Sequence, residues 1–131
     1  VYLDHGGCGF YGVVVQVKKD RAGIAKAAIK ETFKAFEPLQ RVVAVDEDVN
    51  LYDPNDVNWA ITTRFNPDRD LIILPNQVGH ILNPMVKLDP DGKGGTVTKM
   101  GIDATAPYPM TDTFRRVSFI DVDLKNYNID E

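Results

Sequence analysis

Residues 42–74 constrain the fold of this chain most strongly, because they predict a strand, an acidic turn, a helix and a second strand in close succession. Residues 42–45 (VVAV) form a short run rich in β-branched residues, which is typical of a strand buried on both faces. Asp53 is a favourable N-cap, Pro54 suits the first helical position, and Asn66 and Pro67 end the predicted helix. Residues 71–74 (LIIL) follow as a second buried strand, which completes one β-α-β unit.

A further strand and helix precede this unit. Residues 13–17 (VVVQV) predict a strand, and residues 22–36 predict a helix whose apolar face carries Ala25, Ile29, Phe33 and Phe36. After residue 74 we expect a bend at 75–84, a polar glycine-rich loop at 87–95 and a short extended piece at 99–109. Alternating residues at 114–124 fit an edge strand or an arm exchanged with a partner. We therefore predict one α/β domain over residues 1–131: a β-α-β-α-β core, a mostly parallel or mixed sheet flanked by helices, and an irregular C-terminal arm.

Charge and cysteine content narrow the class of protein. The formal net charge is −4 with acidic and basic residues intermixed, which argues against a nucleic-acid or anionic-membrane partner. No apolar run approaches the roughly 20 residues that span a bilayer, and no signal peptide is visible. Cys8 is the only cysteine, so an internal disulfide is excluded and a cytoplasmic location is expected. A start at Val1 in a glycine-rich segment suggests a fragment or a processed product.

Two patterns resemble ligand motifs but lack a required part. Residues 7–12 (GCGFYG) match the dinucleotide fingerprint G-x-G-x-x-G, yet they lead into a strand instead of a helix N-terminus, so we reject that site. Zinc needs three or four ligands at recognisable spacing, and His5, His80 and Cys8 do not supply them. We expect Asp103 and Lys99 to pair at a turn in a structural role. The residues therefore supply no complete catalytic set and no metal site.

The acidic turn at residues 46–50 (DEDVN) has two interpretations. Its alternation resembles the start of a calcium loop, but hydrophobic residues stand where that loop needs its glycine and its glutamate. We therefore favour a structural role, in which Asp46 and Asp48 cap neighbouring backbone or pair with Arg64 or Arg69. The alternative is that these carboxylates border a ligand crevice at the carboxyl end of a parallel strand.

Several longer motifs carry a family resemblance. They are VVVQVKKDRAGIAKAAI at 13–29, VDEDVN at 45–50, NDVNWAITTR at 55–64, NPDRDL at 66–71 and KMGIDAT at 99–105. In this order and spacing they resemble the C-terminal domain of the UbiD-type aromatic acid decarboxylases. The resemblance implies prenylated FMN with a divalent metal, Mn or Mg, held mainly on an earlier domain outside this chain. That earlier domain would also carry the catalytic residues.

The resemblance implies three site residues in this chain. Residues 77–84 (QVGHILNP) match the segment that directs side chains toward the substrate ring, so His80 and Leu82 are expected to bind substrate. An imidazole can hydrogen-bond a phenolic oxygen, which favours a hydroxybenzoate-type acid; a surface histidine in a bend is the open alternative. Lys34 matches a lysine that some members place near the flavin phosphate, and its alternative is a solvated helix lysine.

These observations predict the C-terminal domain of a longer non-oxidative decarboxylase or carboxylase. It would close one wall of the substrate pocket and join subunits into a homo-oligomer, with the flavin-binding domain and an aromatic carboxylic acid as partners. The fragment alone is expected to bind no cofactor and to be catalytically incomplete. Two alternatives remain: a non-catalytic assembly subunit of a multi-subunit carboxylase and, with less support, a stand-alone nucleotide-binding module.

Overall fold

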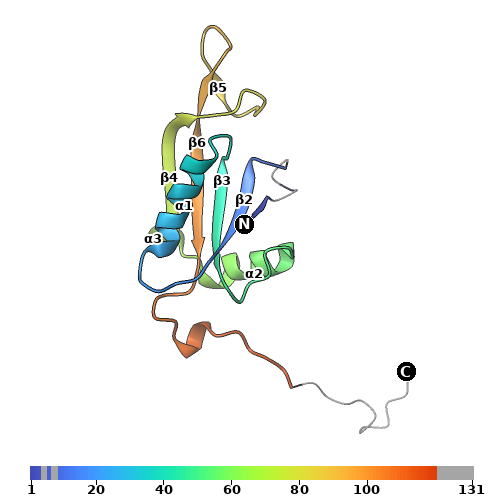
Figure 1. The fold of residues 1–131 in the computed structure, drawn as a ribbon, viewed down its shortest axis with the longest axis vertical. Helices are drawn as coiled ribbons and strands as arrows, with labels where there is room; N and C mark the ends of the chain where they lie inside the picture. The colour runs from blue at the N-terminus through green and yellow to red at the C-terminus, as the bar shows by residue number, and fades with distance from the viewer. Residues whose placement is uncertain (4–5, 7–8, 121–131) are drawn as a thin grey trace, which may run out of the picture.

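The computed structural model of the chain describes residues 1–3, 6 and 9–120, and its core is a six-stranded sheet (Figure 1). The elements are β1 (Tyr2–Leu3), β2 (Gly12–Val17), α1 (Ile24–Ala35), β3 (Arg41–Asp46), α2 (Pro54–Arg64), α3 (Pro67–Asp70), β4 (Leu71–Val78), β5 (Lys87–Leu88), β6 (Gly95–Ala104) and the 3-10 turn η2 (Asp112–Phe114). As expected, the glycine-rich start leads directly into strand β2.

The strands lie in the order β1-β2-β3-β6-β4, and β5 also pairs with β6. β2, β3 and β6 are parallel to one another, whereas β1, β4 and β5 each run antiparallel to their neighbour. The predicted α/β class with a mixed sheet flanked by helices is therefore confirmed. The last strand along the chain, β6, lies between β3 and β4.

α1 covers one face of the sheet, as its predicted apolar stripe requires. Ala25, Ile29 and Phe33 are buried in a cluster with residues of β2 and β3. Phe36 directly follows the last helical residue and is 43% exposed, so it lies outside the core. The helix is thus two residues shorter at its start and one shorter at its end than predicted.

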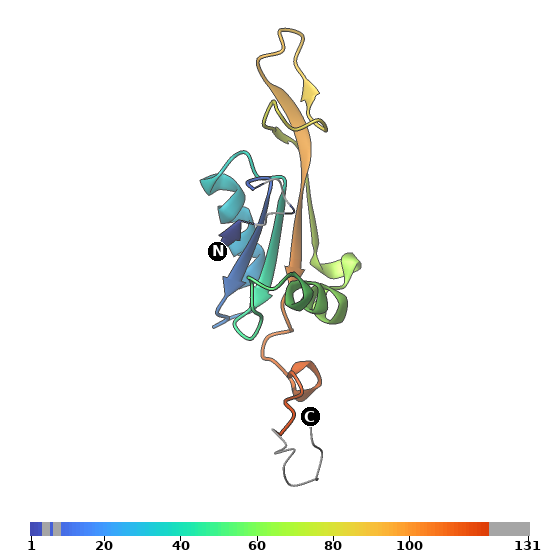
Figure 2. The same cartoon turned by 90° about the vertical axis from the view of Figure 1, so that its right-hand side faces the viewer.

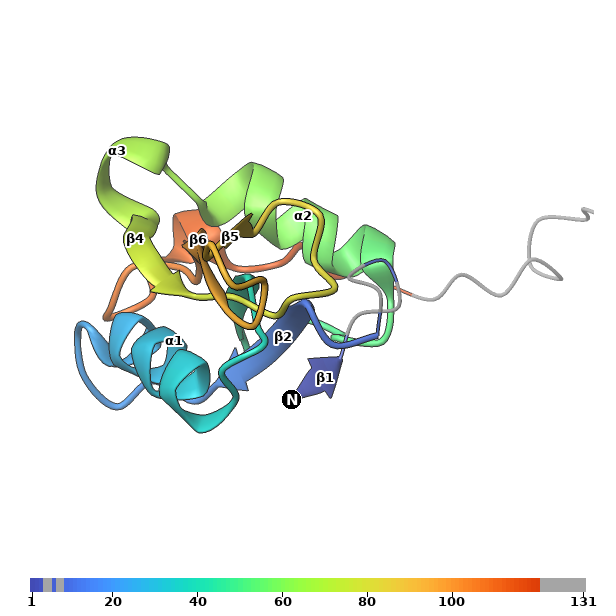
Figure 3. The same cartoon turned by 90° about the horizontal axis from the view of Figure 1, so that it is seen from above.

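α2 covers the opposite face, as the edge-on and top views show (Figures 2 and 3). It begins where predicted, because the Asp53 side chain accepts a hydrogen bond from the Asn55 backbone N–H at 2.9 Å. Val57 and Ala60 of α2 pack with buried residues of β2, β3 and β6. The sheet is therefore covered by a helix on each face, and each helix buries a separate apolar cluster.

The prediction for residues 71–74 is wrong in two respects. These residues begin β4, which is an edge strand antiparallel to β6 and has no contact in register with β3. They are also not fully buried: Leu71 and Ile73 are 37% and 50% exposed, while Ile72 and Leu74 pack toward the α1 cluster. The physical reason is that β6 takes the place beside β3, so β4 has a neighbour on one side only.

The extended piece predicted at 99–109 is confirmed for residues 99–104, but its length and start are wrong, because it belongs to β6, a ten-residue interior strand that begins at Gly95. Two of its inward positions do not look apolar in sequence. The Lys99 ammonium group lies 5.7 Å from the centre of the Phe33 ring and donates a hydrogen bond to the Glu37 carbonyl. At Gly101 a Cβ atom would lie 2.5 Å from Ile29 Cγ2, so only glycine fits there without a shift.

The two ends of the sheet carry irregular segments. The polar loop predicted at 87–95 is the tip of the β5–β6 hairpin, which extends beyond the sheet (Figure 2). Residues 105–120 lie at the opposite end, and residues 115–120 form no strand, whereas residues 121–124 lie outside the described residues. Within the part of the chain that the structure describes, every helix is too short or too polar to cross a membrane.

Candidate functional site

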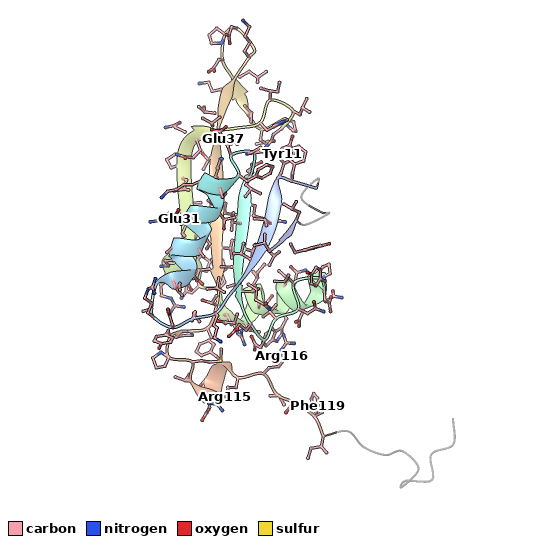
Figure 4. All side chains as sticks on the ribbon, viewed as in Figure 1. Tyr11, Glu31, Glu37, Arg115, Arg116 and Phe119 are labelled. Carbon is pink, nitrogen blue, oxygen red and sulfur yellow. The ribbon has the colours of Figure 1, made fainter. Side chains whose placement is uncertain are left out.

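His80 lies at the amino ends of the parallel strands, packed against two aromatic side chains that directly precede β2. Its ring centre is 5.3 Å from that of Phe10 in an edge-on arrangement and 6.0 Å from that of Tyr11. The Tyr11 hydroxyl is 3.5 Å from His80 Nδ1, and the Leu82 backbone N–H donates to the same nitrogen at 3.3 Å. Tyr11 is visible at this end of the sheet in Figure 4. The imidazole is therefore half-buried and held in one orientation.

Asn83 shapes the loop that carries His80 and Leu82. Its side chain is buried and donates to the Gln40 side chain, while its Oδ1 accepts the Met85 backbone N–H at 3.0 Å. Its backbone N–H donates to the His80 carbonyl at 2.9 Å. The loop is thus anchored to the segment that enters β3, and its conformation depends on one amide side chain.

Leu82 lies on the outer side of this loop and is 73% exposed. Four other large apolar side chains between the end of β4 and β5 are at least half exposed: Val78, Ile81, Met85 and Leu88. We call these five residues the apolar crest. Several exposed apolar side chains in one stretch of the chain are typical of a surface that another part of a protein covers. His80 and Leu82 are therefore brought together on one short loop, and their binding of substrate stays a prediction.

Lys34 lies at the C-terminal end of α1, and no contact joins it to His80 among the described residues. Its side chain is largely exposed and forms an ion pair with Glu31 at 2.6 Å. It also lines a cavity of about 500 Å³ with Lys30 and Lys99, beside β4. Burial lowers the pKa of Lys99 at the floor of this cavity.

Two features of the chain show whether it could hold a flavin phosphate and a metal ion: the lysines at this cavity and the possible metal ligands. Lys30 and Lys34 carry exposed ammonium groups at the cavity, and such groups suit a phosphate. Among the described residues, no three His, Cys, Asp or Glu side chains gather closely enough to hold a metal ion. The chain therefore offers a feature that fits the phosphate end of a flavin, whereas the divalent metal that the resemblance implies has no ligand set among the described residues.

A second polar cluster lies at the carboxyl ends of the parallel strands. Asp46 is buried and pairs with Lys19 at 2.9 Å and with Arg64 at 2.8 Å, and it accepts the Ala106 backbone N–H at 2.7 Å. Arg64 also donates two hydrogen bonds to Asp48, at 2.8 and 2.7 Å. These bonds hold the pKa of Asp48 below its usual value and raise that of Arg64.

This cluster confirms the predicted pairing of the acidic turn with Arg64. Asp46 and Asp48 also line a cavity of about 510 Å³, so the alternative that they border a ligand crevice stays a prediction. Arg64 donates to the Phe114 carbonyl at 3.0 Å, so it also ties the segment after β6 to α2. Arg116 pairs with Asp56 at 2.6 Å, and Figure 4 shows Arg116 below α2 at this end. Arg69 does not take part, because it pairs with Asp70.

Asp103 and Lys99 do not pair, contrary to the prediction. They are four positions apart on one extended strand, which separates them by more than 10 Å along β6. Asp103 instead accepts the Thr105 hydroxyl at 2.6 Å, and Lys99 donates to the Glu37 carbonyl. His5 and Cys8 lie outside the described residues.

Sequence reasoning missed Phe10, Tyr11, Gln40 and Asn83, which surround or hold the His80 loop. Phe10 and Tyr11 stand in a glycine-rich segment that has no periodic pattern. Asn83 precedes Pro84, a pair typical of a turn, and this signal marks it as a loop-shaping residue. Gln40 has no sequence signal, since its contact with Asn83 joins positions 43 residues apart.

Comparisons with known proteins identify the family. Residues 1–104 match the 3-octaprenyl-4-hydroxybenzoate carboxy-lyase C-terminal domain, UbiD_C. The chain is 44% identical to an anhydromevalonate phosphate decarboxylase of Methanosarcina mazei, over 88% of this chain and 26% of that protein. It is 38% identical to a gallate decarboxylase of Lactiplantibacillus plantarum, over 93% of this chain and 26% of that protein.

Solved structures agree with this assignment. The UbiD-class enzyme HmfF from Pelotomaculum thermopropionicum, in complex with FMN, superposes with a TM-score of 0.83 at 34% identity, over 96% of this chain and 28% of that one. An evolved dimeric form of HmfF was solved in complex with prFMN. The chain spans about a quarter of the length of these relatives. It belongs to the UbiD C-terminal domain family.

Proposed function

We propose that this chain is a single domain, the C-terminal part of a longer UbiD-type decarboxylase or carboxylase that acts on an aromatic acid of the hydroxybenzoate type. One observation carries the proposal: a half-buried, hydrogen-bonded imidazole stands on the same loop as three exposed residues of the apolar crest, Ile81, Leu82 and Met85. A site for an aromatic ring needs apolar walls and a small number of oriented polar groups. Crest residues would cover the ring, and His80 would bind its oxygen substituent.

The residues of this chain would position the substrate and exclude water. Leu82 would pack against the ring, because its side chain is 73% exposed here and would be buried by a bound ligand or a facing domain. His80 would hydrogen-bond a phenolic oxygen. Prenylated FMN, when bound, supplies the electron sink for loss of CO₂. Lys34 would contact its phosphate, after leaving its ion pair with Glu31.

The remaining exposed apolar surface would be covered by protein. Leu71 and Ile73 of β4, with the crest residues distant from the ring, would face the flavin-binding domain or a second subunit. The domain would thus join subunits into a homo-oligomer as well as close the pocket. A dimeric form of one relative agrees with this role.

A substitution in the complete, cofactor-loaded enzyme tests the substrate assignment. His80→Phe keeps a ring but removes both nitrogens, so it should slow turnover of hydroxybenzoates by about tenfold relative to turnover of cinnamates. Lys93→Ala, at the distant and exposed hairpin tip, is the matched control and should leave both rates unchanged. Unchanged rates and unchanged preference in His80→Phe would exclude His80 from the pocket.

A second candidate substrate class follows from the relatives. The 44% identity to an anhydromevalonate phosphate decarboxylase favours a non-aromatic, phosphorylated acid. The same enzyme assayed with anhydromevalonate phosphate and with 4-hydroxybenzoate decides between the two classes, because turnover of only the first would overturn the aromatic assignment.

The assembly-subunit alternative makes a different prediction. It expects the catalytic residues on a separate polypeptide, so the natural protein would show two chains under denaturing conditions. A single chain about four times the length of this one would favour the proposed domain role.

A further inference from the structure

The loop around His80 constrains more than the place of the imidazole, because it also constrains which ring nitrogen carries the proton. The Leu82 backbone N–H donates to His80 Nδ1 at 3.3 Å. A backbone N–H can donate but cannot accept a hydrogen bond. A proton on Nδ1 would therefore face another proton, which disfavours the Nδ1–H tautomer in this loop conformation.

Neighbouring contacts keep the Leu82 N–H and the His80 ring in this relative orientation. The His80 carbonyl accepts the Asn83 backbone N–H at 2.9 Å, which closes the turn and keeps the Leu82 N–H directed at the ring. The Tyr11 hydroxyl, 3.5 Å from Nδ1, can donate a hydrogen bond to the same nitrogen. Phe10 meets the ring edge-on and restricts its rotation. Among the described residues, Nε2 has no hydrogen-bond partner.

We propose that the neutral ring of His80 is held as the Nε2–H tautomer and so presents the substrate with a hydrogen-bond donor. Tyr11 and the Leu82 backbone act as positioning groups, since they reach the substrate only through the imidazole. This inference rests on the proposed role of His80 in the substrate pocket, and it narrows the class of substrates that the enzyme would accept. The favoured ring substituent is an oxygen that accepts a hydrogen bond, such as a phenolate, phenol or methoxy oxygen, whereas a protonated amino group is disfavoured.

The first test observes the proton directly in the complete protein labelled with ¹⁵N-histidine. The His80 signals are assigned as those missing from the spectrum of His80→Gln. We expect the neutral ring to carry its proton on Nε2 and none on Nδ1, without any ligand. A neutral ring with its proton on Nδ1 would overturn the proposal.

The second test replaces His80 by two amide side chains, each of which puts a hydrogen-bonding group near one of the two ring nitrogens. In the cofactor-loaded enzyme, His80→Gln places an amide near the Nε2 position, and His80→Asn places one near the Nδ1 position. With 4-hydroxybenzoate as the probe, Gln should keep KM within about threefold of the natural enzyme, and Asn should raise it about tenfold. The reverse order would show that the inner nitrogen matters more and would overturn the donor assignment.

The two tests separate this inference from the proposed function. An Nε2–H signal together with identical KM values for Gln and Asn would keep the tautomer but remove His80 from the substrate pocket. An Nδ1–H signal together with a strong KM effect would keep His80 in the pocket but reject the tautomer and the oxygen-acceptor class.

Discussion

Replacement of Arg64 by methionine should destabilise the fold at the carboxyl end of the parallel strands. The Arg64 side chain is only 1% exposed and donates hydrogen bonds to Asp46, Asp48 and the Phe114 carbonyl. Methionine keeps much of the buried aliphatic stem but removes the charge and every donor. The substitution therefore tests the ion cluster and perturbs packing little.

The magnitude depends on what the two carboxylates retain. Removal of one partner from a buried ion pair costs about 3–5 kcal/mol when the other charge is left uncompensated. Asp46 would still have Lys19 at 2.9 Å and the Ala106 N–H at 2.7 Å, and the partly exposed Asp48 would be hydrated by water. The loss in free energy of unfolding should therefore lie near the lower limit, at about 3 kcal/mol.

Urea denaturation followed by tryptophan fluorescence measures this loss. Trp59 is the single tryptophan, and its ring lies 4.8 Å from the Arg64 guanidinium carbon, so it reports on this region. The matched control is Arg21→Met, which breaks a pair with Asp20 that is 70% exposed on both sides and should leave the free energy of unfolding almost unchanged. Equal losses for the two variants would refute the argument that the buried cluster stabilises this end of the sheet.

Three further outcomes are expected. Gly101→Ala should lower the free energy of unfolding by about 1–3 kcal/mol, because the new methyl group meets Ile29 Cγ2 at 2.5 Å; thermal denaturation measures it, and no change would mean the helix moves freely. Asn83→Ala should speed amide hydrogen exchange at residues 79–86 and leave exchange in β2 and β3 unchanged, whereas a uniform increase would indicate global destabilisation. The stability that Asp48 contributes is present above its usual pKa and is lost as the pH falls through its depressed folded-state value, so Asp48→Asn should reduce the acid-induced loss of stability below about pH 4; an unchanged acid transition in urea titrations would contradict this.

The first half of the fold was predictable because local signals there agree with tertiary packing. The run at 42–45 became the fully buried interior of β3, and Asp53 caps α2 through a contact only two residues away. Hydrophobic periodicity alone placed Ile29 and Phe33 of α1 against the sheet. In each case the determining interaction is local or depends only on an apolar face meeting a core.

The second half was harder to predict because long-range contacts override the sequence pattern. β6 presents Lys99 and Gly101 at buried positions, and each is explained by a distant residue: the Phe33 ring and Ile29, respectively. The order of the strands in the sheet also has no sequence signal, since nothing in residues 71–74 indicates that a later strand separates them from β3. The candidate site depends on such a contact too, because Gln40 anchors Asn83 across the chain.

The place of β6 in the sheet has a consequence for synthesis of the protein. When the ribosome has completed β4, this strand cannot yet join the sheet beside β3. The strand that lies between β3 and β4 is β6, which is encoded later. Until residues 95–104 leave the exit tunnel, β3 exposes an open edge of parallel-sheet backbone to other nascent chains. A stop codon anywhere before residue 95 would therefore remove the middle of the sheet, and the product would be a target for chaperones and proteases.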